Sequence, residues 1–234
     1  ARMSQAIALM PALNGYGTVT AATESASAVD TAAETFVASG LSKVLKINNI
    51  CDNEHLADCG IPTTINDYSN SQLTNSDLAT WVDYNNMSSG SFDTGSAIIE
   101  YNSQTNTKSV AFETQNGESI IVFYNPQCQP DLNETSSYFT QTKMCANFIY
   151  DLNGSKGPNT MGKDIGFITA LYSTDSIVVA PMPLMQKVSS KKKQNEASKA
   201  CTEQDPDSRL PNREEISAMF YNKALLGEMT GGYW

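Results

Sequence analysis

The stretch that decides the fold is CANFIYDLNGSKGPNTMGKDIGFITALYSTDSIVVAP, residues 145–181. It contains two runs rich in β-branched and aromatic residues, 148–150 and 165–172, and this composition predicts strands. The segment between them, 151–164, holds three glycines, one proline, two asparagines and two aspartates. Such a segment cannot be a helix, and its close flanking by strand residues predicts an ordered loop that is built from turns.

Three earlier segments, 97–101, 109–114 and 119–124, have the same strand composition. The Asn116-Gly117 pair between the last two predicts a tight hairpin, because this dipeptide favours the backbone geometry that such turns need. Together with the strands on either side of the loop, these segments predict an antiparallel sheet.

Helical patterns precede this predicted sheet. Thr31 and Glu34 have the spacing of a capping box. The apolar residues that follow at helical spacing are Ala33, Phe36, Val37, Leu41, Val44 and Leu45. A shorter stripe near the start, Met3, Ile7 and Met10, predicts another helix, which Pro11 ends or kinks. The fold class predicted is therefore α+β, with a helix packed on an antiparallel sheet. The polar segment 60–95, with Trp81 and Tyr84 as isolated aromatic residues, predicts surface loops.

Composition narrows the range of functions. The chain has 234 residues, a formal charge of -10 and a pI near 4.5, which is unfavourable for binding nucleic acid or anionic membrane surfaces. No apolar run approaches the roughly 18 residues that a membrane-spanning helix needs. Nucleophilic catalysis would have to use the single histidine, His55. No nucleophile-elbow sequence is present to supply its partner, so we interpret His55 as a surface residue. We therefore expect a protein that is not an enzyme; the alternative is a secreted hydrolase whose turnover depends on a pair of carboxylates, although the sequence singles out no such pair.

The five cysteines show no metal-binding spacing. Cys51 and Cys59 bracket the polar segment DNEHLAD, where a disulfide is more natural than two buried thiols. We predict disulfides between Cys51 and Cys59 and between Cys128 and Cys145, each worth about 2–4 kcal/mol, and an oxidising compartment. Cys201 is left without a predicted partner.

The loop 151–164 contains the hard oxygen donors that calcium prefers, namely Asp151, Asn153 and Asp164 together with backbone carbonyls. Its spacing is not that of an EF-hand, because glycine stands at the fourth position and Gly162 takes the place of the closing glutamate. A structural loop without metal is the alternative and the favoured interpretation. In that case the Asx side chains accept backbone N–H bonds and the glycines adopt positive φ.

The pattern Asp-x-Asn-Gly-x-x-Gly-Pro-Asn-x-x-Gly-x-Asp over residues 151–164, followed by an apolar strand, resembles the C-terminal part of bacterial type IV pilin-like and type II secretion pseudopilin-like proteins. The resemblance covers roughly residues 1–183. It implies a pilin-like fold and subunits that assemble with other copies or related pilins into a filament at the cell surface. It also implies an apolar N-terminal helix, removed from this chain, that anchors the subunit in the inner membrane before assembly.

The segment 184–234 differs in composition and predicts a C-terminal appendage to the globular domain 1–183. Asn212 and Glu215 have capping-box spacing ahead of an apolar stripe formed by Ile216, Met219, Phe220 and Leu225. The tail also resembles about 35 residues of a module found in bacterial surface adhesins, through Arg209-Leu210-Pro211, Arg213-Glu214-Glu215, an apolar helix and the closing Gly231-Gly232-Tyr233-Trp234. That resemblance implies an alternative function, an adhesive minor or tip subunit whose C-terminal module binds a glycan or another surface ligand.

Overall fold

The computed structural model describes residues 5–6, 32–80, 109–124, 142–173, 176–182, 194–204, 206–222 and 225–227. The main expectations that fall outside these ranges concern the strand at 97–101, Trp81 and Tyr84, Cys128, and all of the N-terminal helix except Gln5 and Ala6. Within the described residues, no helix combines the length and the apolar character that crossing a bilayer requires.

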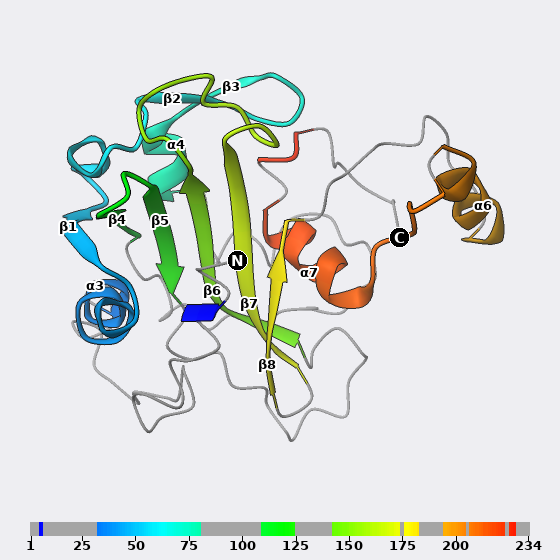
Figure 1. Ribbon diagram of the computed structural model, residues 1–234, viewed down its shortest axis with the longest axis horizontal. Coiled ribbons are helices and arrows are strands. Elements are labelled where there is room, and N and C mark those ends of the chain that lie inside the picture. Colours follow the sequence, from blue (N-terminus) through cyan, green and yellow to red (C-terminus); the bar gives the residue numbers. More distant parts are fainter. Residues whose placement is uncertain are drawn as a thin grey trace.

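A six-stranded antiparallel sheet forms the centre of the molecule (Figure 1). Its strands are arranged in the order β1-β4-β5-β6-β7-β8. From β4 to β8, strands that follow one another in the chain therefore lie side by side in the sheet. Their bounds are β1 Ile47–Asp52, β4 Val110–Thr114, β5 Ser119–Tyr124, β6 Thr142–Asp151, β7 Ile165–Ser173 and β8 Ser176–Pro181. The predicted α+β class with an antiparallel sheet is confirmed. The sequence pattern did not reveal β1, which has exposed asparagines in its middle.

The predicted hairpin between β4 and β5 is confirmed, with Ala111 opposite Ile121 and Phe112 opposite Ile120. The turn closes through the Gly117 N–H, which donates to the Thr114 carbonyl at 2.9 Å. Gly117 has a φ of +80°, a backbone conformation that residues other than glycine rarely adopt. The Asn-Gly dipeptide was therefore a reliable signal for this turn.

One face of the sheet is covered by a helical segment that precedes it in the chain. The segment begins as α3 (Ala32–Thr35), continues as one π-helical stretch η1 (Phe36–Gly40) and ends as a 3-10 turn η2 (Leu41–Lys43). Phe36, Val37 and Leu41 are buried against strand residues, and the Phe36 ring stacks on that of Tyr124 with centroids 4.3 Å apart. The helix predicted up to Leu45 is confirmed as a helical segment over residues 32–43, although regular α geometry ends at Thr35.

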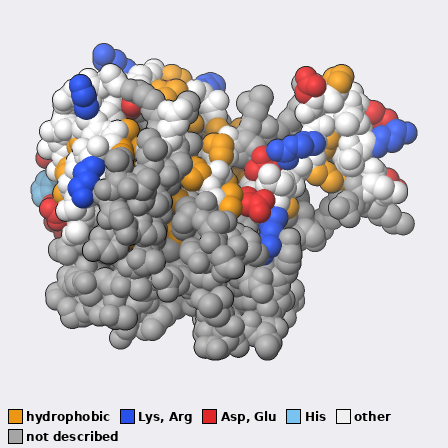
Figure 2. Space-filling view, turned by 60° about the horizontal axis from the view of Figure 1, so that its bottom comes forward, with side chains coloured by type: hydrophobic (Ala, Val, Ile, Leu, Met, Phe, Trp, Pro, Cys, Tyr) orange, Lys and Arg blue, Asp and Glu red, His pale blue; other side chains and the backbone are white. Residues whose placement is uncertain are grey.

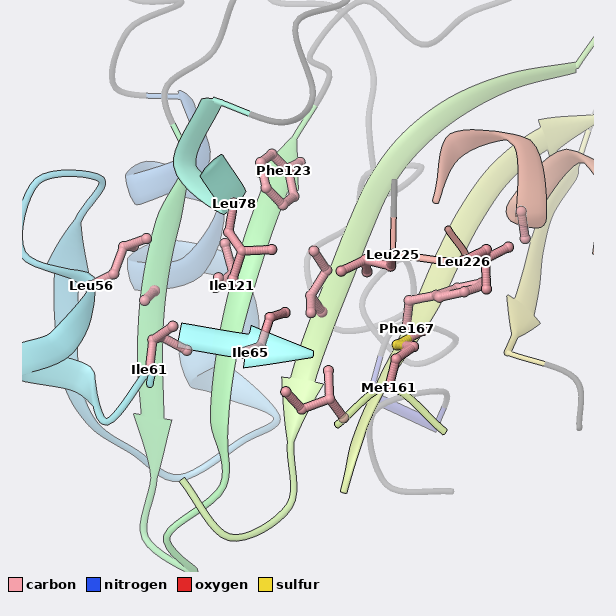
Figure 3. Close-up of a cluster of buried hydrophobic side chains, with 14 of the residues drawn as sticks. Leu56, Ile61, Ile65, Leu78, Ile121, Phe123, Met161, Phe167, Leu225 and Leu226 are labelled. Atoms are coloured by element: carbon pink, nitrogen blue, oxygen red, sulfur yellow. The ribbon is translucent and has the colours of Figure 1, made fainter. Parts of the chain in front are cut away.

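The opposite face of the sheet is covered by shorter elements (Figure 3). These are the 3-10 turn η3 (Leu56–Cys59), the small hairpin of β2 (Thr64–Asn66) and β3 (Gln72–Thr74), and helices α4 (Asn75–Thr80) and α7 (Arg213–Tyr221). They contribute Leu56, Ile61, Ile65, Leu78 and Ala218 to a core that also contains Phe167 and Leu171 of the sheet. The prediction of surface loops for 60–95 is wrong where the structure describes this segment, because residues 64–66, 72–74 and 75–80 form two strands and a helix. Ile61, Ile65 and Leu78, which are too sparse in the sequence to show a period, are buried against the sheet.

The predicted disulfide between Cys51 and Cys59 is present and joins β1 to η3. Cys145 in β6 is fully buried and is also disulfide-bonded. Its predicted partner, Cys128, lies outside the described residues, so that pairing stays a prediction. Cys201 is a half-buried free thiol on α6 (Gln194–Gln204).

The described residues of the C-terminal part of the chain form the helices α6 and α7. The predicted cap of α7 is confirmed, because the Glu215 N–H donates to the Asn212 side chain and the Asn212 N–H donates to the Glu215 carboxylate, both at 2.8 Å. The Arg209 guanidinium donates two hydrogen bonds to the same carboxylate, at 2.8 and 2.7 Å. After α7, Leu225 and Leu226 enter the core of the sheet. This end of the segment 184–234 therefore shares the core of the sheet, and the domain boundary at residue 183 stays a prediction.

A buried polar cluster joins α7 to the sheet. Asn147 of β6 and Asn222, just after α7, exchange two hydrogen bonds of 2.9 and 3.1 Å through their side-chain amides. The Thr169 hydroxyl of β7 donates to the Asn147 amide oxygen at 2.8 Å and accepts from Asn222 at 3.1 Å. All three residues are fully buried. Since unpaired buried amides are costly, these bonds fix where α7 lies on the sheet.

We expect Asn222→Ala to lower the free energy of unfolding by roughly 2–4 kcal/mol, because it leaves the buried side-chain N–H of Asn147 without its acceptor and removes the N–H that the oxygens of Asn147 and Thr169 accept. Denaturant unfolding followed by circular dichroism measures the change. Asn48→Ala, at an exposed asparagine of β1, is the matched control and should change stability by less than about 0.5 kcal/mol. The double variant Asn147→Ala with Asn222→Ala should cost less than the sum of the single changes. Simple additivity would show that the cluster does not act as a unit.

Candidate functional site

The loop 151–164 between β6 and β7, here called the Asp151 loop, is an ordered structure, as predicted. Its ends meet because Asp151 pairs with Ile165 across the two strands, and the Leu152 N–H donates to the Asp164 carbonyl at 3.0 Å. In Figure 1 the loop lies at the end of the sheet beside β2 and β3. Two backbone bonds join it to that hairpin, from the Asn66 N–H to the Asn159 carbonyl at 2.8 Å and from the Met161 N–H to the Asn66 carbonyl at 2.9 Å.

The Asp164 carboxylate organises the second half of the loop. Its two oxygens accept the backbone N–H groups of Asn159 and Thr160, each at 2.8 Å. The Thr160 hydroxyl in turn donates to the Pro158 carbonyl at 2.9 Å. A buried carboxylate that accepts two N–H bonds holds the turn in one conformation, which is the structural role predicted for the Asx residues.

Two glycines of the loop occupy positions that other residues would strain. Gly154 has a φ of +62° and Gly162 has a φ of +81°. A side chain at Gly162 would also press on the Tyr68 ring, since a Cβ there would lie 3.3 Å from it. The predicted positive φ is thus confirmed for these two residues. Gly157 instead precedes Pro158 through a cis peptide bond.

Asp151 differs from Asp164 in its surroundings. Its Oδ1 accepts the Asn153 N–H at 3.0 Å, whereas its Oδ2 is buried and has no hydrogen-bond partner among the described residues. Burial raises the pKa of this carboxyl to about 6, and the negative charge of Asp164 adds to the rise. The fold therefore favours the neutral form of the Asp151 carboxyl.

The three residues predicted for calcium, Asp151, Asn153 and Asp164, do lie on one loop. Among the described residues, no group of three or more His, Cys, Asp or Glu side chains has the arrangement of a metal site. Both Asp164 oxygens are engaged in fixing the backbone, and the Asn153 amide donates to the Gly157 carbonyl at 3.4 Å. Of the two aspartates, this leaves Asp151 Oδ2 as the carboxylate oxygen without a hydrogen-bond partner among the described residues, to which a cation would add together with the Asn153 amide oxygen and backbone carbonyls.

His55 is an exposed residue, as predicted, and lies in the disulfide-closed segment between β1 and η3. Its Nδ1 is 2.7 Å from a carboxylate oxygen of Asp52. This hydrogen bond raises the pKa of His55 and lowers the pKa of Asp52. The contact is an exposed ion pair of a kind that contributes little to stability.

The cluster of Asn147, Thr169 and Asn222 is not predicted by the sequence. Asn222 is separated from Asn147 by 75 residues, so no local pattern joins them. A signal did exist, because Asn147 and Thr169 each stand alone within an otherwise apolar run, 144–150 and 165–172 respectively, and a buried polar residue needs a partner. What the sequence could not give is the identity of that partner.

Comparisons of the chain with protein-family models, with curated proteins and with solved structures found no match.

We expect the stability of the protein to fall as the pH rises through the range in which Asp151 ionises. In the folded protein the Asp151 carboxyl has a pKa of about 6, whereas its ordinary value is 3.8. Between pH 3.8 and pH 6 the folded state therefore binds more protons than the unfolded state. The stabilisation is complete below about pH 4 and is lost as the pH passes 6. Asp151→Asn, which keeps an oxygen for the Asn153 N–H, should therefore be more stable than the wild type at pH 7, by about 1–3 kcal/mol.

Urea unfolding at pH 4 and at pH 7 tests this prediction. The difference between the variant and the wild type should shrink at pH 4, where Asp151 is protonated. Asp58→Asn removes an exposed carboxylate and serves as the control for a change in net charge. An Asp151→Asn variant that is less stable than the wild type at pH 7 would contradict the argument.

We further expect the Asp151 loop to keep its conformation without calcium, because carboxylate and backbone bonds within the protein already fix it. Titration calorimetry on chelator-stripped protein should show no heat when calcium is added. Micromolar binding that Asp151→Asn abolishes would contradict this expectation and assign the loop as a calcium site.

Proposed function

We propose that this chain is the globular head of a structural subunit that assembles into a type IV pilus-like or type II secretion pseudopilus-like filament, without catalysis. The observation that carries the proposal is the helical segment Ala32–Lys43. It precedes the sheet in the chain and is fixed on one of its faces by Phe36, Val37 and Leu41. This arrangement, together with the glycine- and proline-containing Asp151 loop, agrees with what the sequence resemblance implies for a pilin-like fold.

The physical role of such a head follows from its burial pattern. Described elements cover the central part of both faces of the sheet, so neither face is free to bind a substrate or a partner. Contacts between subunits would fall to loops, strand edges and projecting elements. An apolar N-terminal helix would form the core of the filament and, before assembly, anchor the subunit in the inner membrane. Other copies of the chain or related pilins are then its partners, and a filament at the cell surface is its location.

Tagging the subunit in its own cells tests this proposal. The β4–β5 turn is a suitable position, because Gln115 and Asn116 are exposed and space is open around Gly117. With an epitope inserted after Asn116, gold-labelled antibody should mark filaments along their length, and shearing should release the tagged protein with them. Tagged protein that is found only in a soluble fraction, in cells that still carry filaments, would overturn the proposal.

The alternative of an adhesive minor or tip subunit is favoured by the position of α6. This helix stands away from the sheet (Figure 1), and its surface carries acidic and basic side chains close together (Figure 2). Lys199 and Glu203 form one exposed pair at 3.6 Å. In this case gold label would appear at filament tips alone, and the soluble chain would bind on a glycan array. A blank array with label along the filament favours the structural subunit.

A further inference from the structure

A tripeptide of the Asp151 loop, Asn153-Gly154-Ser155, has the sequence of an N-glycosylation acceptor, which is Asn followed at the second position by Ser or Thr with no proline between them. None of the other asparagines in the described residues has Ser or Thr at that position. Two more such tripeptides, beginning at Asn86 and Asn133, lie outside the described residues. Because so short a sequence also occurs by chance, the inference must depend on how the structure presents Asn153.

The loop presents this tripeptide to solvent. Asn153 and Ser155 are both exposed, while Gly154 between them is buried with a φ of +62°. The backbone on either side is held by the Asp151 and Asp164 carboxylates. An acceptor asparagine must reach the active site of a large transferase, and a protruding loop between two strands is the kind of place where that is sterically feasible.

The amide of Asn153 can be modified without loss of the hydrogen bond that it makes. Its Nδ2 carries two hydrogens, and its one hydrogen bond to the described residues is the 3.4 Å contact with the Gly157 carbonyl. Attachment of a sugar replaces one hydrogen and leaves the other for this contact. Asn159, in the same loop, lies only half-exposed and is followed two positions later by Met161, so it is not an alternative acceptor.

The residue before Asn153 is Leu152, an exposed hydrophobic side chain that a glycan would shield from solvent. Leu152 is 56% exposed and, with Tyr68 at 42%, is one of two large hydrophobic side chains that are exposed among the described residues. A bulky, hydrated glycan on the adjacent residue would cover Leu152 and keep this tip of the molecule from associating nonspecifically.

We propose that Asn153 is an N-glycosylation site, and that its substrate is an oligosaccharide joined through a diphosphate to a membrane lipid. The Asn153 Nδ2 attacks the anomeric carbon of the first sugar and forms the N–C bond. The bond between that carbon and the diphosphate oxygen breaks, the lipid diphosphate leaves with the bonding electrons, and the amide gives up one proton. The inference rests on the export that the proposed function requires, in a compartment whose oxidising character agrees with the Cys51–Cys59 disulfide.

Mass spectrometry of the protein isolated from its own cells tests the site. After reduction, trypsin cleaves at Lys143 and Lys156 and releases a peptide of residues 144–156 that contains Asn153 and neither of the other two tripeptides. We expect this peptide to carry the mass of a glycan. The glycan mass itself is the readout, because an Asn-Gly sequence can also deamidate spontaneously.

Variants at Ser155 supply the controls, since this residue is exposed and can change without loss of the fold. Ser155→Ala should abolish the glycan on peptide 144–156, whereas Ser155→Thr should retain it. An unmodified peptide from protein whose Cys51–Cys59 disulfide is formed would overturn the glycosylation site and leave the filament proposal standing. Protein found reduced in the cytoplasm would overturn both. A modification that persists in Ser155→Ala would also overturn the assignment.

Discussion

The structure depends on the central sheet being apolar on both faces, so that neither can be left in water. β5 shows this most clearly, since Ile120 and Val122 point into the core beneath the helical segment Ala32–Lys43 while Ile121 and Phe123 point into the other core. Burial of each such side chain contributes about 1.5–3 kcal/mol. Every other described element that packs on the sheet acts as a cover for one of the two faces, including elements as distant in the chain as η3 and α7.

Hydrophobic burial alone would not decide how those covers are oriented, because apolar contact is non-directional. Directional bonds supply the specificity. The amides of Asn147 and Asn222 pair in one geometry only, and the Cys51–Cys59 disulfide fixes η3 to β1. At the end of the sheet, the backbone bonds between Asn66 and the Asp151 loop fix the β2–β3 hairpin. The sheet thus drives association, and a few polar or covalent links select the arrangement.

The parts of the fold that the sequence predicted are those with a local cause. The β4–β5 hairpin follows from Asn116-Gly117, the start of α7 follows from Asn212 and Glu215, and the order of the Asp151 loop follows from its Asx residues and glycines. The parts that it missed depend on partners far along the chain. The strands β2 and β3 have one fully buried residue, Ile65, and β1 has exposed asparagines. Each is a strand because a neighbouring strand supplies hydrogen bonds, and no local pattern records this.

The roles of the two aspartates of the Asp151 loop could not be predicted from the sequence either. In the sequence they are equivalent oxygen donors at the two ends of one loop, and that equivalence suggested a shared cation. In the structure they have opposite roles, since Asp164 is satisfied by two backbone N–H groups while one oxygen of Asp151 is buried without a partner. A carboxyl in that position is more stable when neutral. The loop is therefore held by the hydrogen bonds that Asp164 accepts and destabilised by ionisation of Asp151, which a proton or a cation at Oδ2 would relieve.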